Sequence, residues 1–67
     1  MENLSSLSEE LGRRIRQKRI SSNLTQAELA KELGVSLRSV QEWEAGRTFP
    51  RASQRKRLAS YFAEAAA

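Results

Sequence analysis

The stretch TQAELAKELGVSLRSVQEWEAG, residues 25–46, decides the fold of this chain because it encodes two short helices and the turn between them. Thr25 and Glu28 have the spacing of a capping box, which predicts that a helix begins directly after Thr25. Gly34 accepts a positive φ at low cost and predicts the end of that helix. The first of the two helices is therefore expected over about residues 26–33.

A second helix is predicted directly after the turn. Ser36 is a typical N-cap residue and Gly46 a typical helix stop, which places this helix at about residues 37–45. Apolar residues at helical spacing in this stretch are expected to face the core: Leu29, Ala30, Leu33, Val35, Val40 and Trp43. Two helices joined by a glycine-containing turn are the form of the DNA-binding helix-turn-helix. A helical hairpin that packs only on itself has the same pattern, so both interpretations stay open at this point.

The composition excludes several kinds of chemistry. The 67 residues include no cysteine, no histidine and no aspartate, which excludes Cys/His metal sites and histidine-based catalysis. Glutamates are the remaining side-chain carboxylates, and a single domain of this size has little volume for a dry catalytic cleft. We therefore expect neither enzymatic activity nor a cofactor. No apolar run reaches the length of a membrane span or signal peptide, which predicts a cytoplasmic location.

The net charge is +4, and the basic residues fall into two clusters. Residues 13–19 contain five cations and no acid, and no carboxylate occurs between Ala45 and Ala63. A basic run is most often only a solvated face. Two such runs on either side of a predicted helix-turn-helix favour phosphate contacts, because a duplex rewards positive charge through counterion release. Double-stranded DNA is therefore the expected partner, with no sign of a membrane or small-molecule ligand.

The chain is predicted to form one domain, residues 6–62, between a flexible tail, residues 1–5, and an alanine-rich end, residues 63–67, that either extends the last helix or frays. The first helix is expected to begin at Ser6 or Ser8, because Ser6 and Glu9 also have capping-box spacing, and to end near residue 21. Its buried stripe is predicted from a four-residue spacing: Leu7, Leu11 and Ile15.

The last helix is predicted from about Ala52 to Phe62. Its inward residues are expected to be Leu58, Ala59 and Phe62. Pro50 excludes helix at Phe49, and Phe49 is interpreted as a core plug rather than a stacking platform. Asn23 is expected to take the left-handed conformation in the break after the first helix.

The segment from Leu11 to Phe62, about three quarters of the chain, resembles the helix-turn-helix domain of the phage repressor and Cro family, also called the XRE type. The matching residues are Leu11-Gly12, Ile15-Arg16, Arg19, Leu24-Thr25-Gln26, Glu28-Leu29-Ala30, Leu33-Gly34-Val35-Ser36, Val40, Trp43-Glu44, Gly46, Pro50 and Leu58-Ala59. The resemblance implies an all-α, compact bundle of the lambda-repressor type with four helices, or a truncated form of a five-helix one. The family usually continues into a fifth helix that often supplies the dimer contact. Residues 63–67 contain no such helix. Three alternatives therefore stay open: the chain is a fragment of a longer repressor, it pairs through another surface, or it binds as a monomer.

The resemblance also implies base contacts. In the family, the second helix of the motif is called the recognition helix, and its first turns enter the major groove. The resemblance assigns this role to Leu37, Arg38, Ser39 and Glu42. Arg38 is the principal candidate because a guanidinium can fork onto guanine O6 and N7. Its alternative partner is Glu42, four residues later on the same helix. Glu42 is expected either to accept from a cytosine amino group or to exclude wrong sequences, and Leu37 to meet a thymine methyl.

Phosphate contacts are implied for a second set: Gln26, Ser36, Arg47, Thr48, Arg51 and Arg14. The family uses Gln26 to hold a phosphate and to brace the start of the recognition helix, and an amide at a helix N-terminus suits an anion. Arg13 and Arg16 are further candidates on the first helix. The matching pair of Arg19 and Glu44 is implied to be a structural link between the first helix and the recognition helix.

These observations predict a sequence-specific, double-stranded-DNA-binding transcription regulator, such as a phage or plasmid repressor or its N-terminal domain. It is expected to bind as a homodimer on a palindromic operator or as a monomer. An antitoxin and a recombination accessory factor are the alternatives. A protein-binding adaptor is disfavoured, because the positive charge around the recognition helix is retained.

Overall fold

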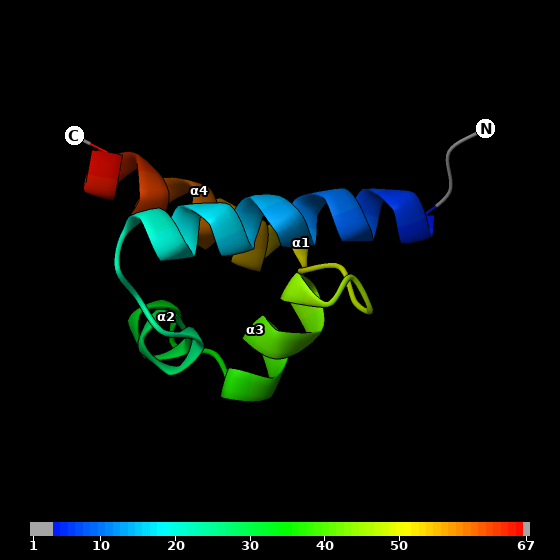
Figure 1. The fold of residues 1–67 in the computed structure, drawn as a ribbon, viewed down its shortest axis with the longest axis horizontal. Helices are drawn as coiled ribbons and strands as arrows, with labels where there is room; N and C mark the ends of the chain where they lie inside the picture. The colour runs from blue at the N-terminus through cyan, green and yellow to red at the C-terminus, as the bar shows by residue number, and fades with distance from the viewer. Residues whose placement is uncertain (1–3, 67) are drawn as a thin grey trace.

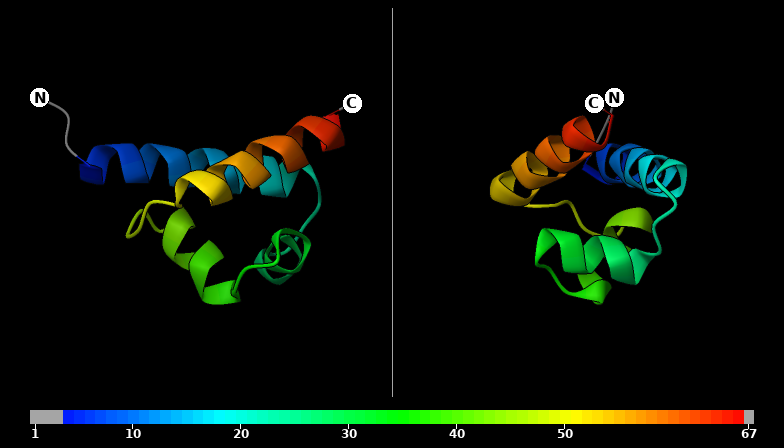
Figure 2. Two further views of the ribbon diagram at one scale, coloured as in Figure 1. Left: turned by 180° about the vertical axis from the view of Figure 1, so that it is seen from behind. Right: turned by 90° about the vertical axis from the view of Figure 1, so that its left-hand side faces the viewer.

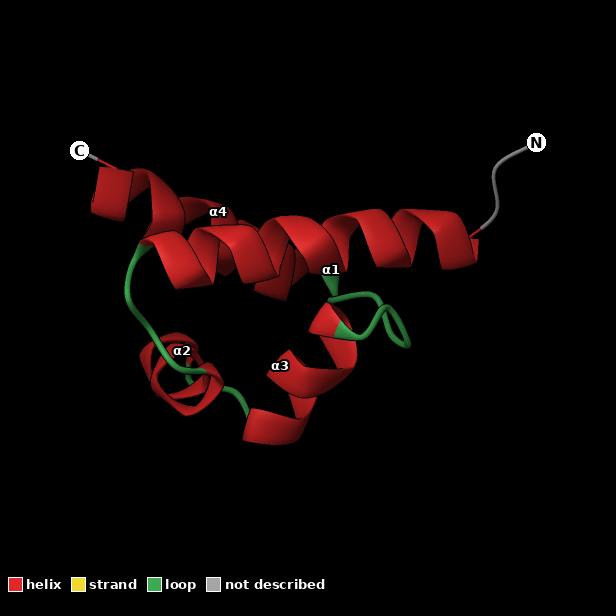
Figure 3. Ribbon diagram, viewed as in Figure 1, coloured by secondary structure: helices red, strands yellow, loops and turns green. Residues whose placement is uncertain are grey.

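The computed structural model describes the backbone of residues 4–66 and the side chains of residues 7–63. This part of the chain forms four α-helices and no strand (Figures 1 and 3). The helices are α1 (Leu4–Ser21), α2 (Gln26–Leu33), α3 (Leu37–Glu44) and α4 (Ala52–Ala66). The predicted all-α, four-helix architecture is therefore confirmed.

The two long helices lie on one side of the molecule and the two short helices on the other (Figures 1 and 2). α3 contacts both α1 and α2, and α2 also contacts α4. All four helices contribute to the core, which consists of Ile15, Leu29, Ala30, Leu33, Val40, Trp43, Leu58 and Phe62. The helix pair α2–α3 is therefore part of a shared core and does not pack only on itself, which removes the isolated hairpin as an interpretation.

The capping box at the start of α2 forms as predicted. The backbone N–H of Glu28 donates to the Thr25 hydroxyl at 3.0 Å, and the backbone N–H of Thr25 donates to the Glu28 carboxylate at 2.8 Å. The second bond lowers the pKa of Glu28 below its usual value. Its contribution to stability is therefore present above the pKa of an unfolded glutamate and is lost as the pH falls through the lowered value. Gly34 ends the helix with φ 69°.

The turn and the end of α3 also follow the local sequence. The Ser36 hydroxyl accepts from the backbone N–H of Ser39 at 3.1 Å, which caps α3. At the other end Gly46 has φ 75°, its N–H donates to the carbonyl of Trp43, and the N–H of Arg47 donates to the carbonyl of Glu42. This pair of bonds is a Schellman motif, and it holds Arg47 against the last turn of α3.

A close approach between α1 and α3 depends on Gly12. A Cβ atom at Gly12 would lie 2.2 Å from the carbonyl oxygen of Trp43, where no carbon can sit. Glycine inside a helix costs about 1 kcal/mol relative to alanine, and here the cost is offset because α1 lies directly on the last turn of α3. That contact brings Arg16 and Arg19 of α1 close to the end of α3.

Two predictions for α1 are wrong. The helix begins at Leu4, so Ser6 lies inside it rather than at its N-cap, and residues 4 and 5 belong to the helix instead of the tail; residues 1–3 lie outside the described part. Leu7 is 42 % exposed, whereas Ile15 is 3 % exposed and Leu11 is half-buried. Residues four apart on a helix differ in direction by about 40°. The stripe therefore rotates away from the core in two such intervals, from Ile15 to Leu11 and from Leu11 to Leu7.

Two predictions near α4 also change, and one alternative that the sequence left open is decided. Phe49 is 41 % exposed and does not plug the core, whereas the next residue, Pro50, is buried. Ala59 is exposed, while Leu58 and Phe62 are buried as expected. The backbone of α4 continues to Ala66, so the alanine-rich end extends the helix.

None of the helices in the described residues is both long and apolar enough to pass through a lipid bilayer.

Candidate nucleic-acid interface

The outer face of α3 carries a shallow hollow lined by exposed side chains. Its lining residues are Leu37, Arg38, Gln41, Glu42 and Arg47. Leu37 is 42 % exposed, and the Arg38 side chain is 84 % exposed. The inner face of the same helix buries Val40 and Trp43. The helix therefore presents its polar and cationic residues outward, as a recognition helix must.

Glu42 lies between two arginines in this hollow. One carboxylate oxygen is 3.6 Å from Nε of Arg38, and the other is 3.6 Å from a terminal guanidinium nitrogen of Arg47. Glu42 is only 20 % exposed, whereas the Arg47 side chain is 74 % exposed. Pairs this open contribute at most about 1 kcal/mol to stability. Their main effect is therefore on the direction of the two guanidinium groups.

The two serines at the start of α3 are joined to each other. Besides accepting from the backbone N–H of Ser39, the Ser36 hydroxyl lies 3.0 Å from the Ser39 hydroxyl. Ser36 is exposed and Ser39 half-buried. Both hydroxyls thus take part in the cap of α3.

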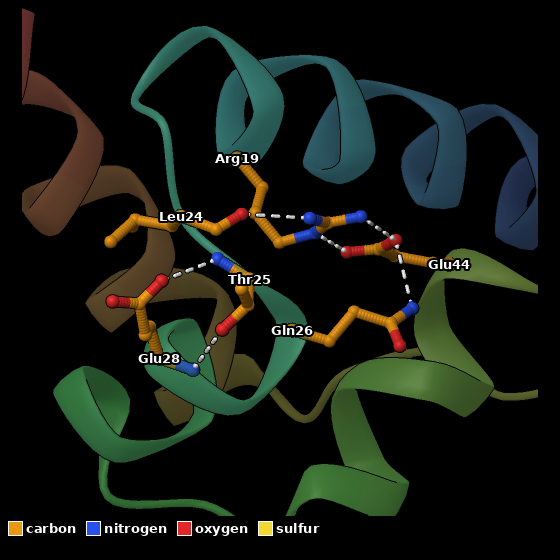
Figure 4. Close-up of polar contacts among 6 residues, drawn as sticks. All are labelled: Arg19, Leu24, Thr25, Gln26, Glu28 and Glu44. Atoms are coloured by element: carbon orange, nitrogen blue, oxygen red, sulfur yellow. Dashed lines mark hydrogen bonds and ion pairs between the residues drawn. The ribbon is translucent and has the colours of Figure 1, made fainter.

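A network of three side chains connects α1, α2 and α3 (Figure 4). Arg19 donates through Nε and a terminal nitrogen to the two oxygens of Glu44, at 2.6 and 3.0 Å. Its other terminal nitrogen donates to the carbonyl of Leu24 at 2.8 Å. The hydrogen bond with Glu44 raises the pKa of Arg19 above its usual value. The implied link between the first helix and the recognition helix is therefore present.

Gln26 joins this network. Its side-chain N–H donates to the Glu44 carboxylate at 3.1 Å (Figure 4). Glu44 is the last residue of α3, so Gln26 braces the end of the recognition helix and not its start, contrary to the expectation from the resemblance. The reason is that α1 brings Arg19 to this end, and Arg19 holds the carboxylate within reach of the amide.

A second hollow adjoins the first through Gln41. It is lined by Arg16, Arg19, Gln26, Gln41, Glu44 and Ala45. We call a set of exposed or half-buried residues around the two hollows the α3 surface: Arg16, Gln26, Leu37, Arg38, Gln41, Glu42 and Arg47. Gln41 was not predicted as a site residue. Its position four residues after Leu37, on the face away from Val40 and Trp43, is the signal that identifies it.

The other predicted phosphate-binding residues lie outside the two hollows. Arg14 pairs with Glu10 at 2.9 Å and lines a groove between α1 and α4. It points about 200° away from Arg16 around α1, so Arg16, not Arg14, reaches the α3 surface. Thr48 is exposed in the loop after α3. Arg51 is exposed, and its backbone N–H donates to the Gln54 side chain at 2.8 Å.

Comparison with known proteins agrees with this geometry. A model of the helix-turn-helix family matches residues 15–64, which include α2, the turn, α3 and most of α4. Searches of curated proteins and of solved structures found no significant match. Because the matched segment covers well over half of the chain, this protein belongs to the helix-turn-helix family of DNA-binding regulators of the XRE type.

Proposed function

We propose that this regulator binds double-stranded DNA sequence-specifically, with the first turns of α3 in the major groove and Arg38 and Gln41 facing base edges. The main support is the exposed face of α3, where the Arg38 side chain is 84 % exposed and lies beside Leu37 and Gln41. Arginine recognises guanine and glutamine recognises adenine through paired hydrogen bonds, and leucine suits a thymine methyl. Ser39 and Glu42 complete the set of base-contacting candidates.

Phosphate contacts are proposed for the border of this face. Gln26 lies at the N-terminus of α2 and Ser36 at that of α3, where free backbone N–H groups favour an anion. Arg47 lies at the far end of α3, and Arg16 lies on α1 beside Gln26. Thr48 and Arg51 extend this border along the loop. Contacts to phosphate fix register, while contacts to base edges provide specificity.

The Arg38→Ala variant tests the base contact. It is expected to weaken binding to the preferred duplex by about 1–3 kcal/mol and to relax preference at one or two base pairs, because a forked bond to a guanine is lost. Binding sites are first selected from random duplexes, and affinities are then measured for the selected site and for single-base variants. Equal losses for matched and mismatched duplexes would assign Arg38 to a phosphate instead.

The Arg47→Ala variant tests the phosphate border. Affinity is expected to fall equally for all duplexes, and the slope of log K against log salt to flatten by about one unit, because one phosphate contact is lost. Lys56→Ala is the matched control, since Lys56 is an exposed cation of α4 outside the α3 surface. Identical salt slopes for the two variants would remove Arg47 from the interface.

The selected sites also report the assembly on DNA. A homodimer requires a palindrome whose half-sites lie about 34 Å apart, one turn of the duplex. An asymmetric site indicates that a monomer binds.

A further inference from the structure

The groove between α1 and α4 is not used by the DNA interface. It consists of two adjoining hollows that share Leu11, Arg14 and Arg55. Leu58 and Phe62 line one hollow, and Leu7 and Phe49 line the other. No residue of α2 or α3 lines either of them. The groove lies between the two long helices, which are on the opposite side of the molecule from the short ones (Figure 2).

The floor of the groove is apolar and partly open to solvent. Leu7 and Phe49 are 42 % and 41 % exposed, and Leu11 is half-buried between them and the core. The apolar side chains therefore form one floor beneath the charged rim, and apolar side chains of a partner helix can cover such a floor.

The rim of this groove is cationic. Arg14, Lys18 and Arg55 line it, and among residues 7–63, whose side chains the structure describes, Glu10 is the only acid that does. Glu10 is already paired with Arg14. Lys18 and Arg55 instead lie over aromatic rings, at 5.8 Å from the centre of the Phe62 ring and 5.0 Å from that of Phe49. Among the described side chains, neither cation forms an ion pair.

We propose that this groove binds an acidic amphipathic helix of a partner protein. Apolar residues of such a helix would cover Leu7, Leu11 and Phe49, and its carboxylates would pair with Lys18 and Arg55. Helices bind grooves of this kind through apolar residues at positions i, i+3, i+4 and i+7. From Leu7 to Lys18 α1 extends about 16 Å, which matches about three turns of the partner helix.

Two other occupants fit the groove less well. A symmetric pair of copies would place the same cationic rim against itself, and like charges across an interface are strongly unfavourable. A duplex would satisfy the cations but not the apolar floor, because phosphate and sugar contacts are polar. An acidic amphipathic segment complements both properties.

The test uses the whole chain and two synthetic peptides of about 18 residues, long enough to form the three turns that the groove accepts. Both carry leucines at helical spacing on one face, and the other face carries glutamates in one peptide and lysines in the second. Fluorescence anisotropy is expected to show at least about tenfold tighter binding of the acidic peptide. Amide chemical shifts are expected to change along α1 and α4 and not along α3.

Charge reversal at the rim is compared with a matched reversal outside it. Lys18→Glu is expected to weaken the acidic peptide about tenfold, whereas Lys56→Glu, with the same change in net charge, leaves its affinity unchanged. Circular dichroism confirms that each variant is folded. If Lys18→Glu is unfolded, Lys18→Gln replaces it, because it removes the charge alone and is expected to weaken the peptide in the same direction.

A saturating duplex separates this proposal from the proposed function. The peptide is expected to bind the protein–DNA complex as well as the free protein, because the two surfaces share no residue. Displacement of the peptide by the duplex would overturn the proposal, since the peptide would then be occupying the α3 surface as a phosphate mimic. Equal binding of the acidic and basic peptides would also overturn it. None of these results bears on the proposal that the protein binds DNA through the α3 surface.

Discussion

Replacement of Trp43 by alanine is expected to unfold the domain or leave it barely stable. The indole is 3 % exposed and packs in the core with Ile15 and Val40. Truncation of a buried tryptophan costs about 3–5 kcal/mol, and a domain of this size has only a few kcal/mol of stability.

Circular dichroism during thermal and urea unfolding measures this effect, since Trp43 is the single tryptophan and fluorescence is lost with it. Leu37→Ala is the control on the same helix. Leu37 is 42 % exposed, so its truncation is expected to change the free energy of unfolding by less than about 1 kcal/mol. An unchanged melting temperature for Trp43→Ala would contradict the packing of α3 described above.

The second large effect is expected for Glu44→Ala. This change leaves Arg19 with only the Leu24 carbonyl as a partner and removes the acceptor of Gln26. The side chains of Arg19 and Glu44 are 13 % and 5 % exposed, and removing one partner of a buried pair costs about 3–5 kcal/mol because the other charge stays buried. A loss of at least about 2 kcal/mol is therefore expected, allowing for the remaining bond and exposure of Arg19.

Two comparisons separate a buried charge from a lost side chain. Glu42→Ala removes a glutamate from the same helix whose partners are exposed, so its cost in unfolding free energy is expected to stay below about 1 kcal/mol. The double variant Arg19→Met/Glu44→Met is expected to be more stable than Glu44→Ala, because no unpaired charge remains. A Glu44→Ala variant as stable as Glu42→Ala would show that the network contributes little.

Much of the fold could be predicted because its signals are local. The bounds of α2 and the start of α3 depend on contacts across three residues, such as Thr25 with Glu28 and Ser36 with Ser39. Gly34 and Asn23 have the positive φ values expected for their residue types. Local patterns were less informative for α1, where apolar spacing predicted a buried Leu7. Which side of a long helix faces the core depends on how the neighbouring helices cross it: Ser8, next to exposed Leu7, is buried.

The candidate site likewise has a part that the sequence predicted and a part that it did not. The outward direction of Leu37 and Arg38 was predicted from the family resemblance, and it agrees with the inward direction of Val40 and Trp43 on the same helix. The identity of the α1 arginine beside Gln26 was not, because Arg14 and Arg16 differ only in their direction around the helix. The crossing of α1 over α3 selects Arg16.

The sequence by itself determined the helix-turn-helix, its caps and the outward face of α3, because hydrogen bonds and helical periodicity within a few residues specify them. The tertiary structure alone decided that Gln26 braces the end of α3 and that α1 packs closely against that end at Gly12. It also decided that Lys18 and Arg55 meet across one groove. Each of these contacts joins residues on different helices, and their distance depends on how the shared core orients those helices.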